Sequence, residues 1–99
     1  MIRHIVTWKL KAEDPDAKAA AFDRLAAGFG ALPHLIPGVK TLHLGRDLDE
    51  IASNWDVVLI LDVASMKDLD EYQVHPEHEK VKLIVRELTG ERSAIDFEL

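Results

Sequence analysis

The sequence predicts an α+β domain whose strands and helices follow the order β-α-β-β-α-β. Segments in which every second residue is apolar alternate with segments in which apolar residues recur at every third or fourth position. Asp-Pro, Pro-Gly and Ser-x-x-Asp sequences mark the boundaries between these segments. The chain has 99 residues and contains no linker, low-complexity tract or tandem repeat, so we expect a single domain over residues 1–99.

The first strand is predicted over residues 2–10, and a helix is predicted to start at Asp14. The even-numbered positions of the strand share one face and are apolar except for His4. Asp14 can cap the free N–H groups of a helix, and Pro15 suits the first helical position. We expect this helix to end by Pro33. Its apolar stripe consists of Phe22, Leu25, Ala26, Phe29 and Leu32.

The second and third strands are predicted over residues 39–44 and 55–63. A Pro-Gly turn at positions 37–38 precedes the second strand, and residues 45–53 form a polar connection between the two. The third strand is apolar on both faces, so we expect it to lie in the middle of a sheet that is covered on both sides. One of its faces carries Trp55, Val57, Leu59 and Leu61, and the other carries Val58 and Ile60.

The second helical segment is divided by Pro76. Ser65 and Asp68 resemble a capping box, and they precede a short helix that carries Leu69 and Tyr72. Pro76 ends that helix and starts another, for which Gly90 is the expected C-terminal stop. The apolar stripe of the second piece is Val81, Ile84, Val85 and Leu88, and residues 92–99 are predicted to form the last strand.

This order of elements is the split βαβ arrangement of the ferredoxin-like fold. Its helices cover only one face of a four-stranded antiparallel sheet. The first and third strands are apolar on both faces, so a monomer would expose a large apolar patch. We therefore predict a homodimer in which two sheets pack face to face and form an α/β barrel. A monomer with a partly solvated sheet is the alternative.

The composition excludes several functional classes. Lys and Arg number 12 against 18 Asp and Glu, which gives a net charge of −6 and disfavours nucleic-acid binding. No apolar run approaches the roughly 20 residues that span a bilayer, and no signal-peptide pattern follows Met1. We expect a cytoplasmic protein, because the chain has no cysteine. No cofactor is expected, because phosphate-binding glycine loops and dinucleotide fingerprints are absent.

The most informative string is Tyr-Gln-Val-His-Pro-Glu-His, over residues 72–78. If Pro76 is the first residue of a helix, His78 lies on the apolar stripe that faces the sheet. Tyr72 should also point inward, where it would meet His4 if the face of the first strand that carries His4 is the covered one. A neutral imidazole can accept a proton near pH 7, and a phenol can donate a hydrogen bond to a carbonyl or a developing enolate. We therefore expect a catalytic pair, Tyr72 and His78, supported by His4. The expected lining residues of the pocket are Val6, Phe22, Phe29 and Val81.

Each of these residues also has a structural interpretation. His75 precedes a proline and suits a helix cap. His78 could bond to a backbone carbonyl, His4 could bridge to a neighbouring backbone group, and Tyr72 could belong to the core. A metal site built from His75 and His78 with His4 or Glu77 is only weakly indicated, because such sites need three or four convergent ligands. We therefore expect no metal.

Several strings together resemble one known family, the stress-responsive A/B barrel (Dabb) domain family. The resemblance extends over nearly the whole chain, and the Tyr…His-Pro-Glu-His string is its most specific part. It implies a dimeric α+β barrel with the helices outside. The strings are His4-Ile5-Val6, Lys9-Leu10-Lys11, Ile36-Pro37-Gly38-Val39, Asp56-Val57-Val58-Leu59, residues 72–78 and Asp96-Phe97.

The resemblance also implies a type of chemistry. One plant member of the family is a polyketide cyclase that performs an aldol-type cyclisation. Its Tyr/His pair is similar to Tyr72 and His78, its first-strand histidine is similar to His4, and Asp56 stands where it has a further histidine. The implied function is binding of a small apolar, carbonyl-containing molecule with acid–base chemistry. The alternatives are a non-catalytic stress-protection or ligand-binding protein, and a cofactor-free monooxygenase or haem-related protein of the wider superfamily.

Overall fold

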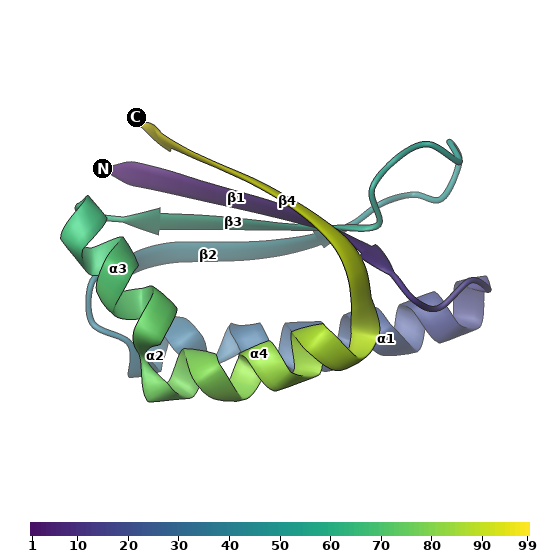
Figure 1. The fold of residues 1–99 in the computed structure, drawn as a ribbon, viewed down its shortest axis with the longest axis horizontal. Coiled ribbons are helices and arrows are strands. Elements are labelled where there is room, and N and C mark those ends of the chain that lie inside the picture. Colours follow the sequence, from purple (N-terminus) through teal and green to yellow (C-terminus); the bar gives the residue numbers. More distant parts are fainter.

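The computed structural model describes all residues from Met1 to Leu99, and its helices lie on one side of a four-stranded sheet (Figure 1). The strand order is β2-β3-β1-β4, and every neighbouring pair is antiparallel. The ferredoxin-like prediction is therefore confirmed. The strands are β1 (Ile2–Leu10), β2 (Val39–Arg46), β3 (Val57–Val63) and β4 (Thr89–Glu98), and the helices are α1 (Pro15–Gly30), α2 (Leu32–Leu35), α3 (Met66–Val74) and α4 (Pro76–Leu88).

Strand β1 alternates strictly between buried and half-buried positions, as its sequence predicts. Its even-numbered side chains face the helices, and all of them except His4 join a core of sixteen buried apolar residues. Its odd-numbered side chains face the open side of the sheet. The alternation places His4 under the helices, between Ile2 and Val6 of the same face.

The helix boundaries follow the capping signals. The Asp14 carboxylate accepts a hydrogen bond from the Ala17 N–H at 2.8 Å, and the Ser65 hydroxyl accepts one from the Asp68 N–H at 3.3 Å. The first helical region differs slightly from the prediction. Helix α1 ends at Gly30, and the short helix α2 follows with Pro33 in its first turn.

Strand β3 starts two residues later than predicted, because Asp56 anchors the chain just before it. The Asp56 carboxylate accepts hydrogen bonds from the Leu10 N–H at 2.7 Å and from Lys18 Nζ at 3.1 Å. Trp55 therefore lies outside the strand, and the Lys9 ammonium lies 5.7 Å from its ring centroid. Strand β2 continues beyond residue 44, its predicted end, and ends at Arg46.

The prediction for Gly90 is wrong. Helix α4 ends at Leu88, and the chain enters β4 directly at Thr89, which has extended backbone angles and pairs with Leu10. The Thr89 hydroxyl donates to the Val85 carbonyl at 2.7 Å, so the helix end is satisfied without a left-handed glycine. Gly90 is an ordinary strand residue, and β4 starts three residues earlier than expected.

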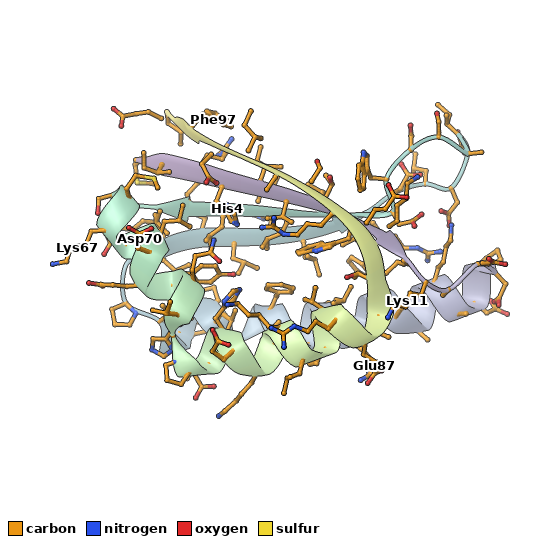
Figure 2. All side chains as sticks on the ribbon, viewed as in Figure 1. His4, Lys11, Lys67, Asp70, Glu87 and Phe97 are labelled. Atoms are coloured by element: carbon orange, nitrogen blue, oxygen red, sulfur yellow. The ribbon has the colours of Figure 1, made fainter.

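The face of the sheet away from the helices is uncovered. The register aligns Ile5 with Ile60 on one side and with Ile95 on the other, so an apolar row crosses the three strands β3, β1 and β4. Ile95 is 60% exposed and Phe97 is 40% exposed. Phe97 lies beyond the sheet from the helices, whereas His4 lies between the sheet and the helices (Figure 2).

Candidate functional site

A cavity of about 260 Å³ lies between the helix-facing side of the sheet and helices α1, α3 and α4. Its floor is apolar, and histidine, tyrosine and basic side chains complete its walls. A larger hollow of about 400 Å³ lies beside the 47–56 loop, but neither histidine nor tyrosine lines it. We therefore take the smaller cavity as the candidate site. It is lined by His4, Val6, Trp8, Phe29, Leu59, Tyr72, Gln73, His78, Lys82, Val85, Arg86 and Arg92.

Tyr72 and His78 meet at the break between α3 and α4. His75 ends α3 and caps α4 by accepting a hydrogen bond from the Glu77 N–H on its Nδ1 at 3.1 Å. Pro76 then starts α4, so Tyr72 occupies the last turns of one helix and His78 the first turn of the next. The two ring centroids are 4.3 Å apart, and the ring planes are inclined by 40°.

His78 has one ring nitrogen committed to the protein and one available. Its Nδ1 lies 3.2 Å from the Gln73 carbonyl, an acceptor, so Nδ1 carries the hydrogen and Nε2 presents a lone pair. Burial lowers the pKa of His78, and the bond to the Gln73 carbonyl opposes part of this shift. The ring is therefore neutral at pH 7 and able to accept a proton on Nε2.

The Tyr72 hydroxyl is completely buried and has no hydrogen-bond partner in the protein. Burial alone raises its pKa well above the ordinary value of 10.0, so the hydroxyl stays protonated over the physiological range. A buried donor without a partner is uncommon, because it has lost water without compensation. The hydroxyl is thus an unused donor beside the available nitrogen of His78.

His4 is held by a carboxylate on the neighbouring strand. The register of β1 and β4 pairs His4 with Asp96, and His4 Nδ1 hydrogen-bonds to Asp96 Oδ1. A carboxylate acceptor at Nδ1 fixes a hydrogen there and sets the orientation of the ring. The His4 side chain is 5% exposed, whereas Asp96 is partly open to solvent. His4 therefore has a carboxylate partner rather than the backbone partner considered from the sequence.

The structure brings together five of the seven residues predicted for the site. His4, Val6, Phe29, Tyr72 and His78 all line the cavity.

The other two, Phe22 and Val81, do not line the cavity. Phe22 is half-buried at the edge of the core. Val81 is directed at α1, where its side chain lies against Gly28. No group of three or more His, Cys, Asp or Glu side chains converges in a geometry suited to a metal ion.

Several lining residues, notably Trp8, Arg86 and Arg92, are not among those predicted from the sequence. The sequence places Trp8 on the correct face, but the burial of its indole Nε1–H without a hydrogen-bond partner depends on the tertiary structure. The partner of His4 was missed as well, because Asp96 reaches it only through the register between two strands that are distant in the sequence. The alternation of charged and apolar residues in the last strand is the one sequence signal that could have indicated Asp96.

The fold and the site together define a ferredoxin-like α+β protein with a cavity between its sheet and its helices. The chain belongs to the stress-responsive A/B barrel domain family, because the model of that family matches residues 2–99. The prediction of this family from the sequence is confirmed. No curated protein matches the sequence, and no helix is long and apolar enough to cross a membrane.

Solved structures show the same fold. A dimeric protein of unknown function from Bacteroides fragilis, with a ferredoxin-like fold, is 25% identical, with a TM-score of 0.88 over 99% of this chain and 95% of that chain. A dimeric ferredoxin-like protein of unknown function from Thermobifida fusca is 28% identical, with a TM-score of 0.83 over 99% and 90%. A hydroxynitrile lyase from Passiflora edulis is 18% identical, with a TM-score of 0.78 over 97% and 90%, and shows similarity of fold alone.

Proposed function

We propose that this protein binds a small, largely apolar carbonyl compound in the cavity and transfers a proton at the carbon next to the carbonyl. The observation that carries the proposal is the buried Tyr72 hydroxyl, which has no protein partner and belongs to a ring 4.3 Å from that of His78. A protonated phenol and a neutral imidazole in one partly dry cavity are the donor and the base that enolisation requires.

The proton-transfer step follows from these two groups. Tyr72 donates its O–H to the carbonyl oxygen, and His78 Nε2 accepts a proton from the adjacent carbon. The C–H bond breaks, its electron pair forms the enolate, and the charge that develops on oxygen is stabilised by the Tyr72 hydrogen bond. The imidazolium then returns the proton to carbon, or the enolate attacks a second carbonyl of the same molecule in an aldol step.

His4 is a positioning residue in this scheme. Its Nδ1 is held by Asp96, so the orientation of the ring in the cavity wall is fixed. The geometry supports this role, since His4 lies on the strand that forms the cavity floor together with Val6 and Trp8.

The size of the cavity limits the substrate. Cavities of about 150 Å³ hold a benzene molecule, so about 260 Å³ has room for one ring with a short side chain. The apolar floor, which includes Phe29 and Leu59, favours an aromatic or aliphatic body.

We further propose that the working form is a homodimer. The open face presents Ile5, Ile60, Ile95 and Phe97, an apolar surface of the kind that a monomer rarely leaves in water. The dimeric relatives from Bacteroides fragilis and Thermobifida fusca support this assembly. The cavity lies on the opposite face, so each subunit would contain a complete site. The cytoplasm is the compartment we propose, on the absence of cysteine from the chain.

The test is solvent exchange at the carbon next to a carbonyl. Phenylacetone in D₂O is followed by proton NMR with the wild-type protein, His78→Gln and Tyr72→Phe. We expect the wild type to accelerate loss of the benzylic proton signal over buffer, and both variants to lose that acceleration. Acceleration that persists in His78→Gln would refute the assignment of the base. Tight binding of phenylacetone without exchange would favour the alternative of a non-catalytic ligand-binding protein, which the same cavity supports.

A further inference from the structure

The mouth of the cavity is positively charged although the protein is acidic. Asp and Glu outnumber Lys and Arg by 18 to 12 over the whole chain. None of the twelve residues that line the cavity is acidic, whereas three of them, Lys82, Arg86 and Arg92, are basic. The charge of the cavity is therefore opposite in sign to that of the protein.

Two of these cations are free of partners. The chain has five arginines, and Arg3, Arg24 and Arg46 each pair with a carboxylate. Arg86 and Arg92 form no ion pair and no side-chain hydrogen bond, so the unpaired guanidinium groups are the two that line the cavity. In a chain with excess carboxylates, this distribution leaves both groups available to a ligand. Lys82 differs from them, because its ammonium lies 2.9 Å from Glu79.

The interior of the cavity also offers hydrogen-bond donors. The Trp8 Nε1–H and the Tyr72 O–H are both buried, both belong to lining residues, and neither has a partner in the protein. An indole N–H can only donate. The cavity therefore suits a ligand with acceptor oxygens at both ends, one near Tyr72 and one near the arginines.

We propose that the substrate carries a carboxylate, which Arg86 and Arg92 bind at the mouth of the cavity while its carbonyl lies at Tyr72. This inference rests on the proposed function, since it names the group at the other end of the carbonyl substrate. Guanidinium groups bind carboxylates through two parallel N–H···O bonds, which orients the ligand as well as attracting it. The substrate class is a small oxo acid with an apolar body.

The position of Arg86 favours a carboxylate over a phosphate. Arg86 lies in the last turn of α4, where the helix dipole places partial negative charge. A dianion is repelled there more than a monoanion. The lining also contains no glycine, so the glycine-rich loop that commonly holds phosphate is absent from this cavity.

The test compares ligands of the same shape and different charge. Isothermal titration calorimetry at low ionic strength measures the binding of phenylacetate, of the neutral phenylacetamide and of phenyl phosphate. The wild-type protein is compared with an Arg86→Gln/Arg92→Gln variant and with an Arg24→Gln/Lys67→Gln control. The control also loses two positive charges, but it loses them from residues outside the cavity.

We expect the wild type and the control to bind phenylacetate about tenfold more tightly than phenylacetamide, as charge-assisted hydrogen bonds at a partly exposed site allow. The Arg86→Gln/Arg92→Gln variant should bind the two ligands equally. Equal affinities in the wild type, or a preference that persists in that variant, would overturn the carboxylate site. Tighter binding of phenyl phosphate than of phenylacetate would overturn the choice of carboxylate.

Two results separate this inference from the proposed function. Exchange of the phenylacetone protons with no preference for phenylacetate would overturn the carboxylate site alone. A preference for phenylacetate that depends on the two arginines, without any proton exchange, would support the site and contradict the catalytic proposal. Failure of all three probes to bind would overturn the carboxylate site.

Discussion

Removal of the Tyr72 hydroxyl should stabilise the protein while it abolishes the proposed activity. The ring of Tyr72 is fully buried and would be retained by Phe at this position, so packing changes little. The hydroxyl has no protein partner, and an unpaired buried polar group costs about 1–3 kcal/mol. We expect Tyr72→Phe to gain about 1 kcal/mol, the lower end of that range. For a domain of this size, this gain raises the unfolding temperature by about 4–8 °C.

The assay is thermal unfolding followed by circular dichroism at one fixed protein concentration, because a dimer unfolds at a temperature that depends on concentration. Thr89→Val is the matched control. It also removes a buried hydroxyl, but one that donates to the Val85 carbonyl at 2.7 Å, so we expect a loss of about 1 kcal/mol. A Tyr72→Phe variant that is destabilised as much as Thr89→Val would show that the Tyr72 hydroxyl is satisfied in the folded protein. Tyr72 would then offer no unused donor to a ligand.

Three further predictions concern the turn, the buried histidine and the open face. Gly38 has a φ of +90°, and a Cβ there would lie 2.7 Å from Asp68 Oδ1, so Gly38→Ala should cost about 1–3 kcal/mol in urea unfolding. Gly30→Ala, with no atom within 4 Å of the added Cβ, should cost nothing. Burial lowers the pKa of His78 below 6.5, so the unfolded state binds more protons than the folded state in this pH range. The free energy of unfolding should therefore decrease as the pH is lowered from 6.5 to the folded-state pKa of His78. His78→Gln should flatten this part of the stability profile. Ile95→Asp should weaken the proposed dimer by about tenfold or more in sedimentation analysis, because an unpaired charge is costly to bury; an unchanged dimer would place the interface elsewhere.

Local signals in the sequence were sufficient for most of the fold. The alternation in β1 and the helix-start signals at Asp14, Ser65 and Pro76 depend on neighbouring residues, and the structure places these elements as predicted. The errors at the starts of β3 and β4 have a different origin. Asp56 and Thr89 set those boundaries through bonds to Leu10 and Val85, and their effect depends on the tertiary structure.

The candidate site was predictable only in part for the same reason. The spacing of Tyr72 and His78 around a proline indicates that the two residues are close, because both lie within one short segment. The bond between His4 and Asp96 spans 92 positions and depends on strand register. The unpaired state of Arg86 and Arg92 depends on where every carboxylate lies, and no local pattern reports it.

Strand β1 supplies side chains to both faces of the sheet, and this determines which mutations the strand can tolerate. The residues at even-numbered positions build the cavity floor, and those at odd-numbered positions form the open face. Substitutions at the two sets of positions can be made independently, so variation in ligand preference does not require variation in assembly. Insertion or deletion of a single codon within β1 would exchange the two sets over the rest of the strand. Such length changes should be far less tolerated in this strand than in the 47–56 loop.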